Sequence, residues 1–242
     1  MKKTLWIVIA GALVASVIAA SAQSEVLSAN AVGYIKREIN SGGKFQTFTV
    51  PLYSMSGSVL FTNTSVAQEA PVGTAVYFWD PTFNGGAGGW DSVTRGTFTG
   101  WGKFNTKTLA SGEGFMLKSP TNSTQNLQLT ITGEVPDEDG LSATIRPGLN
   151  LAMIGNPFPV DVTFGTTALA SNAAVGSIVA FWDPTLSSGR GGWRSTTRGT
   201  FSGWGAAATY LVKAGEAFAF REAGTTNSWS VNRPYTWPDA TP

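Results

Sequence analysis

The sequence predicts an all-β protein made of two tandem homologous repeats of about 100 residues, each the size of one β-sandwich or barrel-like unit. The first observation is a duplication, because the stretch from Trp79 to Phe115 recurs without gaps 103 residues later. The second is that helical periodicity is nearly absent after the first 22 residues. Short runs rich in Val, Ile, Thr and aromatic residues instead alternate with Gly, Pro, Asn and Ser, a pattern typical of strands joined by turns.

Three motifs match most closely between the copies. They are Trp-Asp-Pro-Thr, a nine-residue segment around Arg-Gly-Thr-Phe, and Gly-Glu-Gly/Ala-Phe, found at 79–82 and 182–185, 94–102 and 197–205, and 112–115 and 215–218. Two similar lobes packed together are favoured for this arrangement. A single domain with internal pseudo-twofold symmetry is the alternative.

The first 22 residues are expected to be a cleaved signal peptide. Lys2 and Lys3 precede an apolar run from Leu5 to Ala20, and Ala20-Ser21-Ala22 matches a cleavage site, so the mature chain should begin at Gln23. A membrane anchor is less favoured because the run is short for a span. We therefore expect an exported protein, periplasmic, at the cell surface or extracellular, without a membrane span after cleavage.

The predicted domains are repeat 1 over 23–133, an acidic linker over 134–140 and repeat 2 over 141–242. The linker holds four acids and a proline between glycines. Runs of β-branched and aromatic residues between turn residues predict the strands. In chain order these strands are 31–39, 45–52, 74–79, 97–104, 114–119 and 126–132, then 142–145, 149–154, 177–182, 200–206, 216–221 and 229–233. Helical turns are possible at 65–70 and 167–174.

The amino-acid composition argues against several classes of function. The chain has no Cys and no His, which removes thiol catalysis, the commonest general base and the commonest zinc ligand. Without Lys2 and Lys3, 14 basic residues face 15 acids, so no concentrated basic face is expected for nucleic acid. Charged residues make up only 13% of the chain, and such a surface is poorly protected against association. We expect no cofactor and no metal.

The duplicated acids have structural explanations. Asp80 and Asp183 each precede Pro-Thr, which favours a strand-ending turn over an aspartic-protease-like pair, because that chemistry needs a small residue after Asp. Glu113 and Glu216 are expected to cap tight turns rather than to act as the two carboxylates of a glycosidase. The glycine-rich runs 85–89 and 189–192 do not precede helices, so they favour hairpin tips over phosphate binding.

A duplicated set of aromatic and arginine residues supplies the candidate ligand-binding residues: Trp90, Arg95, Trp101, Trp193, Arg198 and Trp204. Tryptophan faces stack on sugar rings and arginine reaches hydroxyls or carboxylates, so one carbohydrate site per repeat is possible. The alternative is a small core in each repeat, since tryptophan is usually mostly buried. Nearby, Asp91 becomes Arg194 and Ala87 becomes Arg190, so two ligand sites would prefer different charges.

A resemblance rests on two segments of the second copy, 147–151 (Pro-Gly-Leu-Asn-Leu) and 155–159 (Gly-Asn-Pro-Phe-Pro), with Phe181-Trp182-Asp183, Gly215–Phe218 and the N-terminal 28–34. These segments resemble uncharacterised secreted β-repeat proteins of verrucomicrobial-type bacteria. The first copy departs from this pattern, with Phe48–Leu52 in place of the Asn-Pro-Phe-Pro segment. The resemblance implies export and β structure.

We therefore expect a secreted, non-enzymatic β-repeat protein with a structural or self-associating role at the cell envelope or outside the cell. The alternative is a carbohydrate-binding, lectin-like module with one aromatic site per repeat. The expected partners are copies of the chain itself or a polysaccharide, and not nucleic acid.

Overall fold

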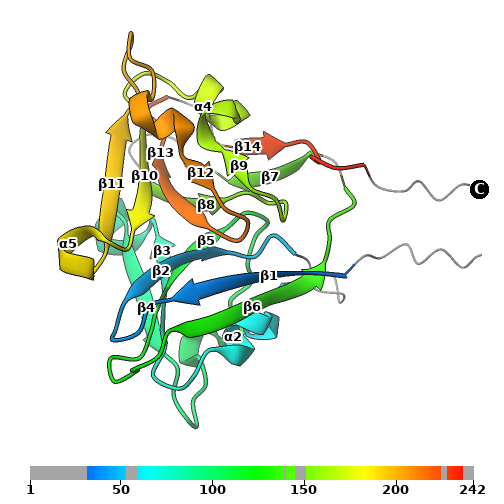
Figure 1. The fold of residues 1–242 in the computed structure, drawn as a ribbon, viewed down its shortest axis with the longest axis vertical. Coiled ribbons are helices and arrows are strands. Elements are labelled where there is room, and N and C mark those ends of the chain that lie inside the picture. The colour runs from blue at the N-terminus through cyan, green and yellow to red at the C-terminus, as the bar shows by residue number, and fades with distance from the viewer. Residues whose placement is uncertain (1–31, 53–58, 139, 145–150, 225–227, 237–242) are drawn as a thin grey trace, which may run out of the picture. The chain divides into compact units, whose positions relative to one another are not determined.

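The structure is a computed structural model that describes residues 32–52, 59–138, 140–144, 151–224 and 228–236. These residues belong to one compact unit, Ala31–Trp237. Strands dominate it and its helices are all short, so the all-β prediction is confirmed (Figure 1). The expected signal peptide lies outside the described residues.

The first repeat contains a four-stranded antiparallel sheet with the order β2-β5-β3-β4 and a separate two-stranded ribbon, β1-β6. Its strands are β1 (Val32–Ile39), β2 (Phe45–Thr49), β3 (Ala75–Asp80), β4 (Gly89–Thr94), β5 (Gly114–Lys118) and β6 (Leu127–Glu134). Its short helices are η1 (Phe61–Asn63), α2 (Ser65–Glu69), α3 (Phe83–Gly86) and η2 (Gly102–Thr106). Thr64 caps α2, because its side chain accepts a hydrogen bond from the Ala67 N–H.

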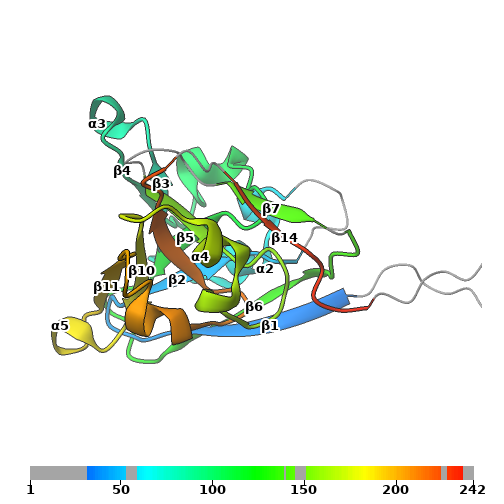
Figure 2. The ribbon, with the colours of Figure 1, turned by 90° about the horizontal axis from the view of Figure 1, so that it is seen from above.

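The second repeat has the same organisation, with a sheet of order β8-β13-β10-β11 and the ribbons β7-β14 and β9-β12. Its strands are β7 (Leu141–Thr144), β8 (Leu151–Gly155), β9 (Val162–Thr163), β10 (Ile178–Asp183), β11 (Gly192–Thr197), β12 (Leu211–Val212), β13 (Ala217–Arg221) and β14 (Ser228–Val231). Its helices are η3 (Phe164–Thr166), α4 (Ala168–Asn172), α5 (Leu186–Gly189) and η4 (Gly205–Thr209). In Figure 2, the turns that carry α3 and α5 project away from their sheets.

Each repeat encloses a core between its sheet and its short helices. Phe61 and Phe115 pack edge to face in the first core, and Phe164 and Phe218 do the same in the second. All four phenylalanines are fully buried, or nearly so. Aromatic packing of this kind adds to the hydrophobic stabilisation, so each core supports its own sheet.

The two repeats meet through reciprocal backbone contacts. The Thr49 N–H donates to the Gly215 carbonyl at 3.0 Å, and the Gly155 N–H donates to the Gly112 carbonyl at 2.9 Å. A Cβ atom at Gly155 would lie 2.4 Å from Thr49 Cγ2, so only glycine allows this approach. The edge strand β8 thus packs beside β5, and β2 packs beside β13.

Two predicted strands are wrong and four real ones were not predicted: β4, β11 and the two-residue strands β9 and β12. Residues 97–104 and 200–206 form tight turns followed by η2 and η4, because Gly100 and Gly203 adopt positive φ and reverse the chain. The strands β4 and β11 were missed. They mix Trp, Val and Thr with Gly, Ser, Asp and Arg, and they form by pairing with β3 and β10.

The predicted helical turns, glycine-rich run and linker agree with the structure to different degrees. The helical turns at 65–70 and 167–174 are present as α2 and α4. The glycine-rich run 85–89 lies at the tip of the β3–β4 hairpin, as expected. The predicted linker 134–140 begins inside β6, and within it the Pro136 carbonyl accepts a hydrogen bond from the Tyr235 hydroxyl at 2.7 Å.

Candidate functional site

Trp101 and Trp204 occupy equivalent places in the two cores. They are only 3% and 5% exposed, and their indole N–H groups donate to the Ala67 and Ala170 carbonyls at 3.0 and 2.8 Å. Each tryptophan thereby links a short helix, α2 or α4, to the start of η2 or η4. Their ring faces are covered by the core and cannot stack on a ligand.

Arg95 and Arg198 follow the edge strands β4 and β11. The Arg95 guanidinium lies 5.8 Å from the Trp101 ring and donates hydrogen bonds to the Gln68 and Ala70 carbonyls. The Arg198 backbone pairs with Ser177, just as the Arg95 backbone pairs with Thr74. Arg95 therefore holds the end of α2 in place.

Trp90 and Trp193 remain partly exposed, and the structure brings them together. Each packs edge to face on the tryptophan opposite it in the hairpin, Trp79 or Trp182, at 5.4 and 5.3 Å between ring centroids. Both line one groove of about 230 Å³, together with Phe45, Tyr77, Met116 and Trp182. The expected two sites, one per repeat, are thus replaced here by one groove that both repeats build.

Among the described residues that line the groove, none has a charged or amide side chain, and Tyr77 supplies a hydroxyl. Sites that bind sugars need polar groups to fix the hydroxyls as well as aromatic faces. The Trp182 indole N–H is already occupied, because it donates to the Phe45 carbonyl at 2.9 Å. The groove therefore matches an apolar surface better than a carbohydrate site.

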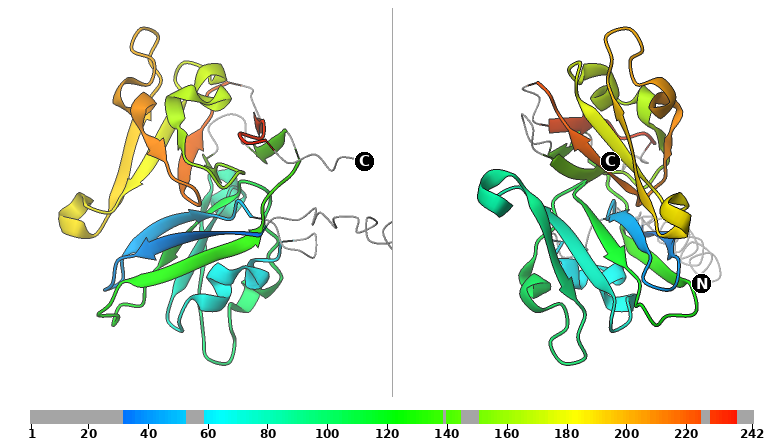
Figure 3. Two further views of the ribbon diagram at one scale, coloured as in Figure 1. Left: turned by 45° about the vertical axis from the view of Figure 1, so that its right-hand side comes forward. Right: turned by 90° about the vertical axis from the view of Figure 1, so that its left-hand side faces the viewer.

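Two nearly identical loops carry the most exposed aromatic side chains of the described residues. Gly96 and Gly100 form an isolated β-bridge around Thr-Phe-Thr, and Gly199 and Gly203 do the same around Thr-Phe-Ser. The phenylalanines at the centres of these loops, Phe98 and Phe201, are fully exposed. Figure 3 shows the loops that follow β4 and β11 extending beyond their sheets.

Half-exposed valines add to these loops. Val72 and Val175 precede Gly73 and Gly176, whose backbone N–H groups donate to the Arg95 and Arg198 carbonyls. Each loop therefore has an apolar phenylalanine and an apolar valine near the same end of a hairpin. Neither phenylalanine was among the predicted ligand-binding residues. The duplicated glycines four residues apart were the available signal in the sequence.

The duplicated aspartates form the expected turns. The Thr82 N–H and hydroxyl donate to Asp80 Oδ1 at 2.8 and 2.7 Å, and Thr185 makes the same bonds to Asp183 at 2.8 and 2.6 Å. Asp183 also accepts a hydrogen bond from Arg194 Nε. In the first repeat, the residue equivalent to Arg194 is Asp91, which pairs with Lys103.

Hydrogen bonds from Thr185 and then Arg194 lower the pKa of the Asp183 carboxyl to about 2. Because the folded pKa lies below its unfolded value near 4, the stabilisation is present above about pH 4 and is lost as pH falls toward 2. An NMR titration of Asp183 should therefore give a pKa near 2. In an Arg194→Ala variant the pKa should rise but stay below its usual range, since Thr185 remains. A titration at the ordinary value in the unaltered chain would contradict these bonds.

The duplicated glutamates cap turns in two different environments. Glu113 pairs with Lys107 at 2.7 Å and accepts the Ala110 N–H at 3.0 Å, and both side chains are partly exposed. Glu216 is buried, and it accepts the Tyr210 hydroxyl at 2.7 Å and the Lys213 N–H at 3.3 Å.

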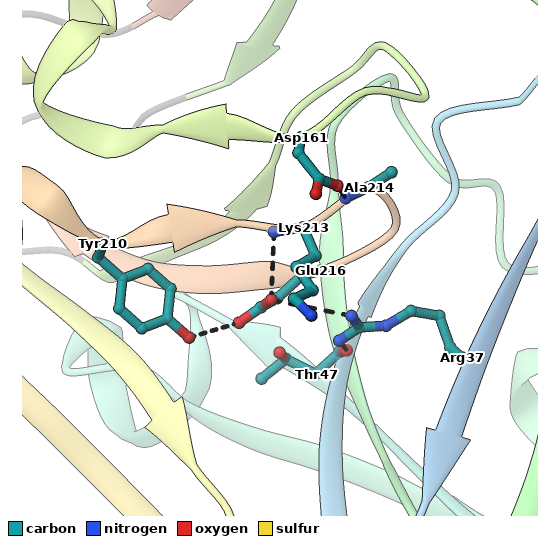
Figure 4. A network of polar contacts seen from close by, with 7 residues as sticks. All are labelled: Arg37, Thr47, Asp161, Tyr210, Lys213, Ala214 and Glu216. Carbon is teal, nitrogen blue, oxygen red and sulfur yellow. Dashed lines mark hydrogen bonds and ion pairs between the residues drawn. The ribbon is translucent and has the colours of Figure 1, made fainter.

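A buried ion pair joins the two repeats (Figure 4). Arg37 of β1 lies 3.8 Å from Glu216, and its guanidinium also donates to the Thr47 carbonyl at 3.5 Å. Burial lowers the pKa of Arg37, while the Glu216 carboxylate opposes this change. Burial and then Glu216 raise the pKa of the Tyr210 phenol. This network therefore holds charged groups inside the protein and links the two repeats.

A small polar cavity of about 200 Å³ lies where β5 meets β8. Trp79, Lys107 and Ser111 line it, and neither Trp79 Nε1 nor Ser111 Oγ has a hydrogen-bond partner among the described residues. In the second repeat the equivalent indole, Trp182, bonds to Phe45 instead. The two sides of the repeat interface therefore differ.

The largest of the three described cavities, about 460 Å³, lies in the second repeat alone. Its lining is formed by Phe181, Trp182, Asp183, Pro184, Arg194, Thr196, Ala206, Ala207 and Tyr210. It combines aromatic walls with an ion pair, and none of the six predicted site residues takes part. The signal in the sequence was the loss of Lys103 and Phe104, which become Ala206 and Ala207.

In the described ranges, no group of three or more acidic, His or Cys side chains is placed to hold a metal ion. None of the helices in the described part of the chain has the length and apolar character of a membrane span. Comparisons with models of protein families, with curated proteins and with solved structures find no match to this chain.

Proposed function

We propose that this chain is an exported, non-enzymatic β-repeat protein that associates with copies of itself at the cell envelope or outside the cell. In this proposal, two homologous repeats of about 100 residues follow a cleaved signal peptide. The four-stranded sheet described in each repeat is open, which corrects the barrel-like alternative and leaves the sandwich-like one. The observation that carries the proposal is the duplicated loop with a fully exposed phenylalanine, Phe98 or Phe201, at its centre.

A phenyl ring exposed to water is energetically unfavourable. Burying one such side chain is worth about 1.5–3 kcal/mol. The bridges Gly96–Gly100 and Gly199–Gly203 each close one loop, so the phenylalanine ring is held outward with less ordering cost on contact. Since the two loops are nearly identical, either can pack against either loop of a second copy.

Each loop contact is expected to be weak. One phenylalanine and one valine from each partner cover far less than the roughly 1,000 Å² of a stable interface. Two loops on one chain nevertheless supply two contacts, and linked contacts strengthen one another. With only 13% charged residues, little repulsion between copies opposes this association. We expect concentration-dependent, open-ended assembly.

The non-enzymatic part of the proposal is supported by the state of the acids. Asp183 is held in a turn and an ion pair, Glu113 pairs with Lys107, and Glu216 is buried against Arg37. The sequence supplies neither His nor Cys as a base or nucleophile. A carboxylate mechanism would need two acids in contrasting, accessible environments.

Sedimentation velocity of residues 23–242 over a concentration series tests the proposal. The wild-type chain should sediment faster as concentration rises, whereas a Phe98→Ser/Phe201→Ser variant should remain monomeric. Tyr34→Ser is the matched control, because Tyr34 is also an exposed aromatic residue but lies on β1. Loss of association in this control, with association kept in the double variant, would contradict the proposal.

Carbohydrate binding is the second candidate function. The described residues that line the groove at Trp90 and Trp193 include no charged or amide side chain for hydroxyls, whereas those of the second-repeat cavity include Asp183 and Arg194. That cavity therefore supplies the observation that favours this candidate.

A further inference from the structure

The cavity in the second repeat exists because the copies have diverged. In the first repeat, Phe104 is buried and packs edge to face on Phe78, with ring centroids 4.9 Å apart. The residue at the equivalent position, 103 residues later, is Ala207. Its neighbour Lys103, which pairs with Asp91, becomes Ala206. The side chains that fill this space in one repeat are therefore absent in the other.

Other substitutions in the second repeat supply the aromatic and polar residues that line this cavity. Tyr210 replaces Lys107 and stacks on Phe181, with centroids 3.8 Å apart and an angle of 11° between the rings. Arg194 replaces Asp91 and pairs with Asp183. At about 460 Å³, the cavity falls within the size range of small-molecule sites, which are mostly apolar and carry a few convergent polar groups.

We propose that this cavity binds one pyranose ring of a neutral saccharide. The partly buried ring of Tyr210, with the buried Phe181 ring stacked behind it, suits the C–H face of a sugar ring. The Asp183 carboxylate can accept hydrogen bonds from hydroxyls and the Arg194 guanidinium can donate to them. Because these two groups already neutralise each other, the site favours an uncharged ligand over an acidic one.

The polar groups are positioned before any ligand arrives. Thr185 fixes one oxygen of Asp183, and Arg194 Nε contacts the other. The Arg194 side chain is nevertheless 64% exposed, so the rest of its guanidinium faces solvent at the cavity. The hydrogen bond from Tyr210 to Glu216 fixes the phenol. Such preorganisation lowers the ordering cost of binding.

The saccharide site does not depend on self-association, because the lining residues do not include Phe98 or Phe201. It is a single site in the second repeat, with no matching cavity expected where Phe104 and Lys103 fill the first. This asymmetry separates it from a site carried by both copies.

Isothermal titration calorimetry of residues 23–242 with cellohexaose, laminarihexaose and mannohexaose tests the proposal, with a tri-galacturonate and cyclohexanol as comparison ligands. The titrations run to roughly 10 mM, which covers millimolar dissociation constants. At least one neutral oligosaccharide should bind with a stoichiometry of one. Repeating the titration with the Phe98→Ser/Phe201→Ser variant separates saccharide binding from self-association, and binding should be unchanged there.

Two variants assign the binding to the cavity. Ala207→Phe combined with Tyr210→Lys rebuilds the filling of the first repeat and should abolish binding. Arg194→Ala alters an exposed side chain, so the chain should still fold, and binding should weaken roughly 10- to 100-fold. Lys103→Ala is the matched control in the first repeat and should bind normally.

The outcomes are distinct. Binding by a neutral oligosaccharide that is lost in the rebuilt variant and weakened by Arg194→Ala supports the proposal. Absence of binding by all three neutral oligosaccharides overturns it, as does binding only by the galacturonate or only by cyclohexanol. Binding that survives Arg194→Ala unchanged also overturns it, even if the rebuilt variant fails to fold.

Discussion

Replacing Glu216 by alanine is expected to lower the free energy of unfolding by about 3–5 kcal/mol. The substitution leaves the Arg37 guanidinium buried without its carboxylate partner. It also removes the acceptor of the Tyr210 hydroxyl. Because Arg37 belongs to the first repeat and Glu216 to the second, the loss should destabilise both together. Urea unfolding followed by fluorescence measures the change.

Glu113→Ala is the matched control, since Glu113 occupies the equivalent position in the first repeat. Its partner Lys107 is partly exposed, and such pairs contribute about 0–1 kcal/mol. A loss at Glu216 no larger than the loss at Glu113 would contradict a buried pair between the repeats. Glu216→Gln should give an intermediate loss, because the amide oxygen can still accept from Tyr210.

Trp101→Ala and Trp204→Ala should each cost about 3–5 kcal/mol, the usual range for removing a large aromatic side chain from a core. Each substitution empties the space beside Phe61 or Phe164. It also leaves a helix carbonyl, that of Ala67 or Ala170, without its indole donor. Differential scanning calorimetry of the single variants measures the loss.

Trp90→Ala and Trp193→Ala are the controls for these variants. Both rings are partly exposed at the groove, so their removal should cost clearly less than removal of Trp101 or Trp204. Equal losses for all four substitutions would contradict the division of the duplicated tryptophans into two core residues and two groove residues.

Much of the fold was predictable because the duplication repeats the same local signals. The strands β3, β5, β10 and β13 lie in apolar runs bounded by turn residues, and all four were predicted nearly to their ends. The Asp-Pro-Thr motif predicted its turn because the short side chain of Asp80 bonds to the backbone two residues later.

The edge strands β4 and β11 were not predicted from the sequence, for a physical reason. The segment Gly89–Thr94 mixes strand-forming Trp, Val and Thr with Gly, Asp and Ser, and it becomes a strand through pairing with β3. Conversely, residues 97–104 carry strand-forming residues, but Gly100 and Gly102 at positive φ turn the chain. Local composition predicts neither outcome without the neighbouring strand.

The candidate site was only partly predictable. The sequence does not distinguish Trp90 from Trp101, because both are duplicated and both lie beside glycines. Trp90 lies on the edge strand β4, whereas Trp101 follows the next loop and is buried against α2. The pairing of Arg37 with Glu216, 179 positions apart in the printed sequence, depends on how the repeats meet. The cavity at Arg194 depends on a missing side chain, Phe104 to Ala207.

Sedimentation equilibrium of three forms of residues 23–242 tests the central claim most directly: the wild-type chain, Phe98→Ser and Phe201→Ser. A chain with two equivalent loop contacts forms open-ended oligomers, whereas a chain with one loop contact ends at a dimer. We predict a continuous series of oligomers for the wild-type chain and a monomer–dimer equilibrium for each single variant. A wild-type chain that stays monomeric at high concentration, or single variants that assemble as far as the wild type, would contradict self-association through these loops.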